Sequence, residues 1–149
     1  MTLSIVTAML APVKPVLAPQ PTTDDRHYWD GIAAGQLLLQ RCSQCQTMRH
    51  PPRPMCGNCH SLEWETLPSD CRATVISWII PRHPPVAEGD EQLIALVETT
   101  EGARLVVNLH DFPLGESVND ARIEIFMHDV GDGVILPQGR PLPAAGQVA

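Results

Sequence analysis

Residues 40–62 read QRCSQCQTMRHPPRPMCGNCHSL, and they contain the pattern that decides the fold: two Cys-x-x-Cys pairs separated by ten residues. Each pair can close into a tight turn that directs two thiolates to one point, and two such turns supply the four-sulfur shell that Zn²⁺ accepts. A segment of about 25 residues cannot build its own hydrophobic core, so we expect a metal ion to hold it folded. The sequence therefore predicts one structural zinc ion, with no ligand position left for water, bound by Cys42, Cys45, Cys56 and Cys59.

Other uses of these cysteines fit the sequence less well. Two disulfides would require an oxidising compartment, and residues 1–21 lack the basic start and the cleavage site of a secretory signal. A redox Cys-x-x-Cys needs only one pair, in a βαβ setting. Rubredoxin-like iron uses the same four thiolates, and sequence alone separates it poorly from zinc. We therefore favour structural zinc in a cytoplasmic protein.

Charge is distributed unevenly along the chain. Residues 31–62 carry three arginines and no acid, whereas residues 63–149 carry fourteen acids against five arginines, within a total net charge of −7. This change predicts a boundary near Leu62 between a basic and an acidic module. Four thiolates around Zn²⁺ leave a charge of about −2, which nearby arginines can balance. Arg49 and Arg53 therefore either balance the thiolates or bind the phosphates of a ligand, and both interpretations stay open.

The segment before the cysteines predicts an arm and a helix. Residues 1–22 are expected to form a flexible arm that its prolines keep extended, although its apolar residues Leu3, Ile5 and Met9 also suit docking on a partner. Thr22 or Thr23 can cap a helix over residues 24–35. A short strand is expected at 37–39. The apolar face of the helix either packs on its own domain or contacts a partner protein; its residues are Tyr28, Trp29 and Ile32.

After Leu62 the sequence predicts a β module over residues 63–140, followed by a tail at 141–149. Short runs rich in apolar and β-branched residues recur between turn signals, with almost no helical pattern. Five such strands favour a small closed barrel of the OB type, in a chain that is mainly β. A long polar loop at 81–92 separates the first two strands. The expected strands are 73–80, 93–99, 103–110, 122–127 and 134–136.

Composition argues against two kinds of partner. The chain has 17 acidic and 10 basic residues and only six aromatic ones, whereas barrels that bind nucleic acids need cations and stacking rings. No apolar run approaches the roughly 18–20 residues of a membrane span. We therefore expect neither a nucleic acid nor a membrane as partner.

Several motifs together resemble a known family. They are Tyr28-Trp29-Asp30-Gly31, residues 35–42, the four cysteines with Pro51-Pro52-Arg53 between them, and Ser77-Trp78. Over about residues 24–140 the chain resembles the acyl-CoA-associated zinc-ribbon/OB-fold family, long catalogued as domain of unknown function thirty-five. The resemblance implies an N-terminal helix, a rubredoxin-like zinc ribbon and a five-stranded OB barrel.

The same resemblance implies a role. Members generally work as small subunits beside thiolase-like enzymes or hot-dog-fold enoyl-CoA hydratases, and the active-site groups look to belong to the partner. The sequence departs from the family pattern at 69–73, which replaces a Gly-x-Gly, and at Gln46 and His60, where glycine is common. In such an assembly Arg49 and Arg53 would lie near CoA phosphates.

Independent catalysis is not expected. Some side chains could in principle act in catalysis, namely those of Cys71, His83, His110 and His128. The sequence does not show these residues converging, and no nucleophile elbow or phosphate-binding loop occurs. We expect an accessory subunit of an acyl-CoA-processing complex. A thiolase-fold partner carrying out a sterol side-chain retro-aldol or thiolytic reaction comes first, and a hydratase complex comes second. A free-standing nucleic-acid or protein adaptor is the alternative of another class.

Overall fold

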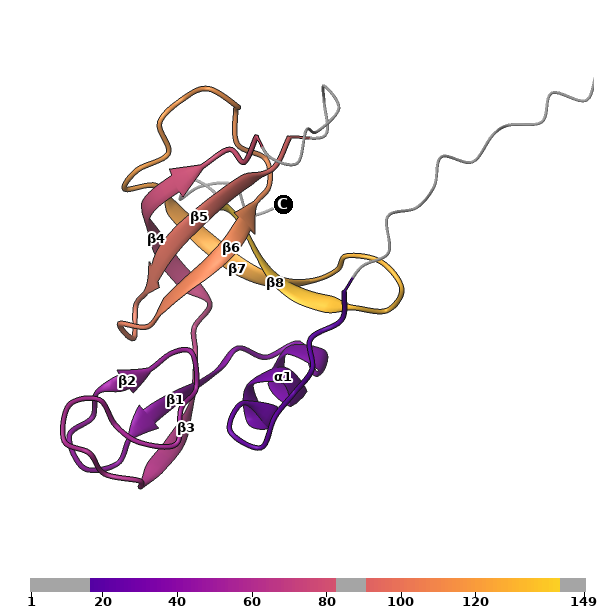
Figure 1. The fold of residues 1–149 in the computed structure, drawn as a ribbon. Helices are drawn as coiled ribbons and strands as arrows, with labels where there is room; N and C mark the ends of the chain where they lie inside the picture. The colour runs from indigo at the N-terminus through magenta and orange to yellow at the C-terminus, as the bar shows by residue number, and fades with distance from the viewer. Residues whose placement is uncertain (1–16, 83–90, 143–149) are drawn as a thin grey trace, which may run out of the picture.

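The computed structural model describes residues 17–82 and 91–142. The expected arm with Leu3, Ile5 and Met9, the histidine at position 83 and most of the tail lie outside them. The described part is mainly β, with a zinc-ribbon sheet and helix on one side of a barrel (Figure 1). No helix in it is long and apolar enough to cross a membrane. The elements are α1 (Arg26–Ala33), β1 (Leu38–Cys42), β2 (Met48–Arg49), β3 (Trp64–Pro68), β4 (Arg72–Ile79), β5 (Leu93–Thr99), β6 (Arg104–Leu109), β7 (Arg122–Asp129) and β8 (Ile135–Pro141).

The barrel confirms the predicted OB type. Its five strands close in the order β4-β5-β6-β8-β7, in which β8 pairs antiparallel with β7 and parallel with β6. Burial alternates along β5, so every second residue, beginning with Leu93, points into the barrel core. The last strand is longer than the predicted 134–136. Its prolines concealed it, because proline inside a run normally argues against a strand.

The ribbon sheet extends further than the charge pattern indicates. β1 lies between β2 and β3, and β3 pairs with β1 from Leu38↔Pro68 to Cys42↔Trp64. The change from ribbon sheet to barrel therefore falls between Pro68 and Arg72, later than Leu62. The residues around Trp64 are acidic, as are many residues of the barrel, so the charge pattern groups them with the barrel. Charge does not determine with which strand they pair.

The helix is shorter than the predicted 24–35, and its start differs. Asp25 occupies the N-cap, and the predicted cap Thr22 instead donates hydrogen bonds to the Asp25 carboxylate from its backbone N (2.6 Å) and its hydroxyl (2.7 Å). The other Asp25 oxygen accepts a bond of 3.2 Å from the Trp29 indole N–H. Asp25 thus both fixes the chain before the helix and orients the Trp29 side chain.

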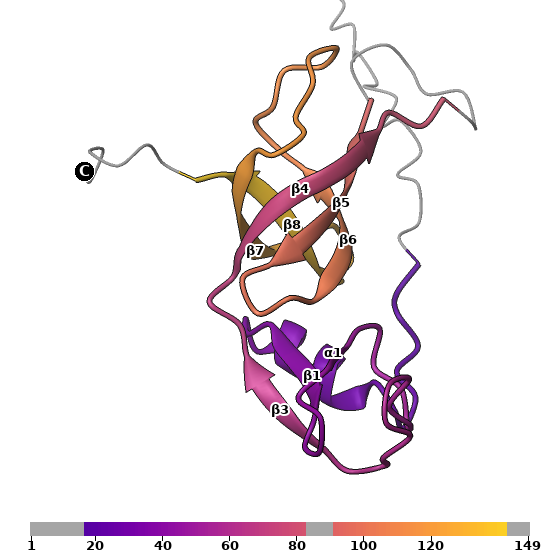
Figure 2. The same cartoon turned by 90° about the vertical axis from the view of Figure 1, so that its left-hand side faces the viewer.

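The helix and the ribbon share one hydrophobic core with the barrel. Tyr28 and Ile32 from α1 and Leu37 and Leu39 from the ribbon belong to the same buried cluster as the barrel residues around Val75. Both views show α1 beside the ribbon strands with the barrel above them (Figures 1 and 2). The ribbon therefore packs against the barrel as well as around its metal site.

Gly139 in β8 allows the barrel to close tightly, and replacing it with alanine should destabilise the fold by about 1–3 kcal/mol. An added Cβ would lie 2.7 Å from Leu109 Cδ2 and 2.9 Å from Ile123 Cδ1, both on buried side chains. Urea unfolding measures the loss. The control is Gly57→Ala, where the nearest side-chain atom is 3.6 Å away. Equal losses in both variants would contradict this account.

Candidate metal centre

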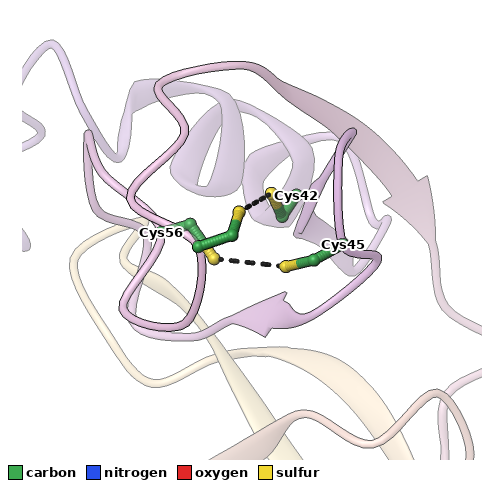
Figure 3. Close-up of side chains that lie close together, drawn as sticks. Cys42, Cys45 and Cys56 are labelled. Atoms are coloured by element: carbon green, nitrogen blue, oxygen red, sulfur yellow. Dashed lines mark hydrogen bonds between the residues drawn. The ribbon is translucent and has the colours of Figure 1, made fainter.

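The four cysteines predicted to bind zinc lie together. Their sulfur atoms all fall within 4.8 Å of one another, with 3.6 Å between Cys42 and Cys59 and 3.5 Å between Cys45 and Cys56 (Figure 3). All four are free thiols, not disulfides. A tetrahedral zinc site with Zn–S bonds of about 2.3 Å has sulfur–sulfur edges of about 3.8 Å. The geometry therefore fits a tetrahedral four-thiolate zinc site with only small movements of the sulfurs.

Each Cys-x-x-Cys pair forms the same turn. The backbone N–H of Gln46 donates to the Cys42 carbonyl, and that of His60 donates to the Cys56 carbonyl, each at 3.0 Å. Gln46 and His60 have φ values of 62° and 61°, the left-handed region that favours glycine. These two residues, which replace glycines common in the family, therefore occupy strained backbone positions. The metal-binding geometry forms in spite of them.

Hydrogen bonds favour the thiolate form at two of the four sulfurs, those of Cys45 and Cys42. At Cys59 the backbone N–H of Ser61 lowers the pKa, but the neighbouring cysteines outweigh it and raise the pKa to about 11. The hydroxyl and backbone N–H of Thr47 lower the pKa of Cys45 to about 5, and the Thr47 oxygen lies 3.2 Å from the sulfur. The backbone N–H of Cys45 is the main cause that lowers the pKa of Cys42 to about 7. Because zinc binds thiolates, these bonds favour the ligand form before the metal arrives. Thr47 was not singled out from the sequence, although its place two residues after Cys45 is a signal.

Arg49 is turned inward and is 1% exposed. Its guanidinium donates to the backbone carbonyls of Pro54 (3.3 Å), Ser61 (2.9 Å) and Glu63 (2.9 Å). Burial alone would lower its pKa, but the hydrogen bond and charge attraction to the Cys42 thiolate outweigh burial and raise the pKa of Arg49. These contacts favour the charge-balancing interpretation for Arg49 over a contact with phosphate.

Arg53, in contrast, is exposed. Its backbone N–H donates to Oε1 of the buried Gln40 at 2.9 Å, which fixes the position of the proline-rich connection. Gln40 was not recognised from the sequence, since a glutamine in a short apolar strand carries no signal of this bond. The Arg53 side chain remains available to an anionic ligand.

The three helix residues predicted for a partner interface differ in exposure. Tyr28 and Ile32 are buried in the shared core, with 6% and 1% of their surface exposed. Burial also raises the pKa of Tyr28 to about 12. Trp29 is half-buried, and its ring packs edge-on against Tyr28 at 5.0 Å between centroids. Of the three, Trp29 alone offers surface to a partner.

Among the described residues outside the metal site, no catalytic group is formed by Cys71, His110 and His128. The Cys71 sulfur contacts the Ser69 carbonyl at 3.9 Å, and burial raises the pKa of its thiol. The rings of His110 and His128 lie 5.7 Å apart, and His110 Nε2 is 2.9 Å from Gln138 Oε1. Within residues 17–82 and 91–142 no hydrogen bond joins Cys71 to either histidine, and the four zinc-site cysteines are the one group able to hold a metal.

Comparison with sequences finds relatives of the ribbon and the barrel. Residues 29–65 match a family model described as "ChsH2, rubredoxin-like zinc ribbon domain". The chain is 41% identical over 96 residues to a "Probable enoyl-CoA hydratase alpha subunit" of Thermomonospora curvata, covering 62% of this chain. It is 33% identical over 96 residues to the "3-oxo-4,17-pregnadiene-20-carboxyl-CoA hydratase alpha subunit" of Mycobacterium tuberculosis, covering 63% of this chain. The matches cover 30% of each of these relatives, so the chain corresponds to less than a third of their length.

Two solved structures share the architecture. A chain of the structure titled "Ltp2-ChsH2(DUF35) aldolase" is 32% identical, with a TM-score of 0.74, and the match covers 83% of this chain and 98% of that one. A protein of unknown function from the DUF35 family of Sulfolobus solfataricus is 16% identical, with a TM-score of 0.56, over 77% of this chain and 82% of the other. The second likeness concerns the fold alone.

Proposed function

The chain belongs to the DUF35 family of zinc-ribbon and OB-fold proteins, and from this premise we propose that it is an accessory subunit of an acyl-CoA-processing enzyme complex. One observation carries the proposal: this chain matches a chain of the Ltp2-ChsH2(DUF35) aldolase over 98% of that chain's length. The name of that aldolase joins two components, as expected for an enzyme with an accessory subunit. Two relatives named as alpha subunits of CoA-thioester hydratases support the same substrate class.

In this proposal the zinc site is structural and the chemistry belongs to the partner. Four thiolates complete the tetrahedral shell, so the metal has no position for water or substrate. Neither Cys71 nor the paired His110 and His128 is placed beside a nucleophile–base partner in the described residues. The free thiols suit the reducing cytoplasm, where we place the complex.

A thiolase-fold enzyme is the first choice of partner, acting on a sterol side-chain CoA thioester by retro-aldol cleavage or thiolysis. The structural relative is named as an aldolase, which supports this choice. An enoyl-CoA hydratase is the second choice, supported by the names of the curated relatives. Exposed Arg53 would face the phosphates of CoA bound by the partner.

Co-expression with any thiolase-like or hydratase-like protein whose gene lies beside that of this chain tests the proposal. Size-exclusion chromatography with light scattering should show a stable heteromer, and acyl-CoA turnover should require both proteins. A monomer that elutes apart from every such candidate would contradict the subunit role. Salt-dependent oligonucleotide binding by that monomer would instead support the adaptor.

Trp29→Ala should weaken assembly by about 2 kcal/mol if Trp29 anchors the partner. Its ring is already partly buried, so a partner can cover the remainder at little cost in ordering. The measurement is the dissociation constant of the heteromer, with zinc content as a check on folding. Trp78→Ala is the matched control, since Trp78 is also half-buried against the core but lies on β4. Equal weakening in both variants would show that Trp29 acts through fold stability and not through contact.

A further inference from the structure

A cleft of about 640 Å³ lies where the helix, the ribbon and the barrel meet. Its walls come from α1, from the ribbon loop at 50–52 and from the outer faces of β5, β6 and β8. Both ribbon views show α1 and the ribbon strands below the barrel (Figures 1 and 2). β5 and β6 are the second and third strands of the barrel, the face on which OB barrels bind ligands. The volume falls within the range of about 300–1,000 Å³ typical of small-molecule sites.

The cleft has two kinds of apolar wall. One side presents ring systems from Tyr28, Trp29 and two prolines of the 50–52 loop. The other presents aliphatic side chains on the outer face of the barrel, where Leu96 pairs with Val106 across the strands. Val106 is 66% exposed, although an outward position on a solvent-facing sheet is normally polar. Ring side chains opposite an aliphatic surface suit a rigid, apolar ligand.

The charges in the cleft offer no site for phosphate groups. Arg104, the one cation among the described residues that line the cleft, is paired with Glu98 through a bond of 2.8 Å. Asp25 adds a negative charge at the helix end of the cleft. Phosphates need unpaired cations or free N–H groups, so neither a nucleic acid nor the CoA head group fits here.

Polar groups mark places where a ligand oxygen could bind. His50 lines the cleft, and its Nδ1 atom is buried without a hydrogen-bond partner, which is uncommon. Burial lowers the pKa of His50 to about 4, so the ring is neutral near pH 7 and can donate from one nitrogen. Asn108 and Gln138 line the barrel side of the same cleft. A mainly apolar ligand with one or two carbonyl oxygens matches these walls.

We propose that this cleft binds the polycyclic, apolar part of the acyl group of a CoA thioester, remote from the thioester that the partner enzyme transforms. The inference rests on the proposed function and adds a ligand site on this chain itself. The name of the M. tuberculosis relative specifies a pregnadiene acyl group, a rigid ring system carrying a 3-oxo oxygen, and such a group has the shape and polarity of the cleft. The accessory subunit would thereby select the acyl group.

Binding can be measured on the full-length, zinc-loaded chain without a partner. The probe is 3-oxo-4-pregnene-20-carboxylic acid, compared with an unbranched fatty acid of similar carbon number and with free CoA. The chain has three tryptophans, and of these Trp29 lines the cleft. The steroid acid should shift the indole N–H signal of Trp29 in ¹⁵N-correlated spectra and leave those of Trp64 and Trp78 in place. Equal shifts with the fatty acid, shifts caused by CoA alone, or no saturable shift would each overturn the proposal.

A pair of variants locates the site. Val106→Glu places a charge on the cleft wall, and Leu114→Glu makes an equivalent change on the loop between β6 and β7, outside the cleft, where Leu114 is 50% exposed. Both positions are exposed, so both variants should fold. Val106→Glu should bind the steroid acid at least tenfold more weakly, whereas Leu114→Glu should bind it like the wild type. Equal affinity in the two variants would overturn the proposal.

The assembled enzyme separates this proposal from the proposed function. In the complex, Val106→Glu should raise KM for a polycyclic acyl-CoA at least tenfold and leave KM for a short acyl-CoA unchanged. Failure of Val106→Glu to assemble, with normal zinc content, would assign the face to the partner protein and overturn the acyl site. A wild-type chain that binds the steroid acid but assembles with no enzyme would contradict the proposed function and leave the cleft site supported.

Discussion

Replacing Cys56 with serine should abolish zinc binding and unfold the ribbon, the largest effect expected for any single substitution in this chain. Cys56 is fully buried, and its sulfur lies 3.5 Å from that of Cys45. A structural zinc site contributes on the order of 10 kcal/mol, which is comparable with the whole stability of a domain. Because Leu37 and Leu39 of the ribbon belong to the shared core, the barrel should lose stability as well. Metal analysis should fall from about one zinc per chain to about none.

The fifth cysteine provides a matched control for this substitution. Cys71→Ser changes the same atom at the start of the barrel, outside the four-sulfur cluster, and should keep the zinc. Removing the zinc from the wild-type protein with a chelator should disorder the ribbon to the same extent as Cys56→Ser. A Cys56→Ser protein that stays folded without metal, or a wild-type ribbon held by two disulfides, would refute the zinc site as the stabilising element.

Replacing Arg49 with glutamine should destabilise the ribbon by about 3–5 kcal/mol, the second-largest effect. The change removes a buried positive charge beside the thiolates. It also leaves three backbone carbonyls without the hydrogen bonds that the guanidinium donates to them. Lysine should restore only part of the loss, because an ammonium cannot reproduce the planar set of donors. Zinc affinity and chemical unfolding measure the effect.

Arg53→Gln is the control, because Arg53 lies on the same segment but is exposed. It should leave stability within about 0.5 kcal/mol of the wild type. If Arg53 faces CoA phosphates in the complex, KM for acyl-CoA should rise, most clearly at low salt. A rise in KM for Arg49→Gln with unchanged stability would reverse the roles assigned to the two arginines.

The metal centre and the fold class could be predicted from local signals. The spacing of Cys42, Cys45, Cys56 and Cys59 specifies two turns and four thiolates without reference to the rest of the chain, and the sulfurs do converge. Alternating apolar residues between turns indicated the barrel strands, and five strands with almost no helix left few other closed arrangements. Local patterns were less reliable for β8, because its prolines read as a loop.

Only the tertiary structure decided which of the similar residues are available for binding. Sequence treated Arg49 and Arg53 alike, yet one is buried among carbonyls and the other faces solvent. It also grouped Tyr28 and Ile32 with Trp29, although the first two belong to the shared core. The cleft is lined in part by α1 and β6, which lie about 75 residues apart in the chain. Ligand spacing is a property of neighbouring residues and can be read from the chain, whereas burial and clefts arise when distant segments pack, so they appear only in the folded molecule.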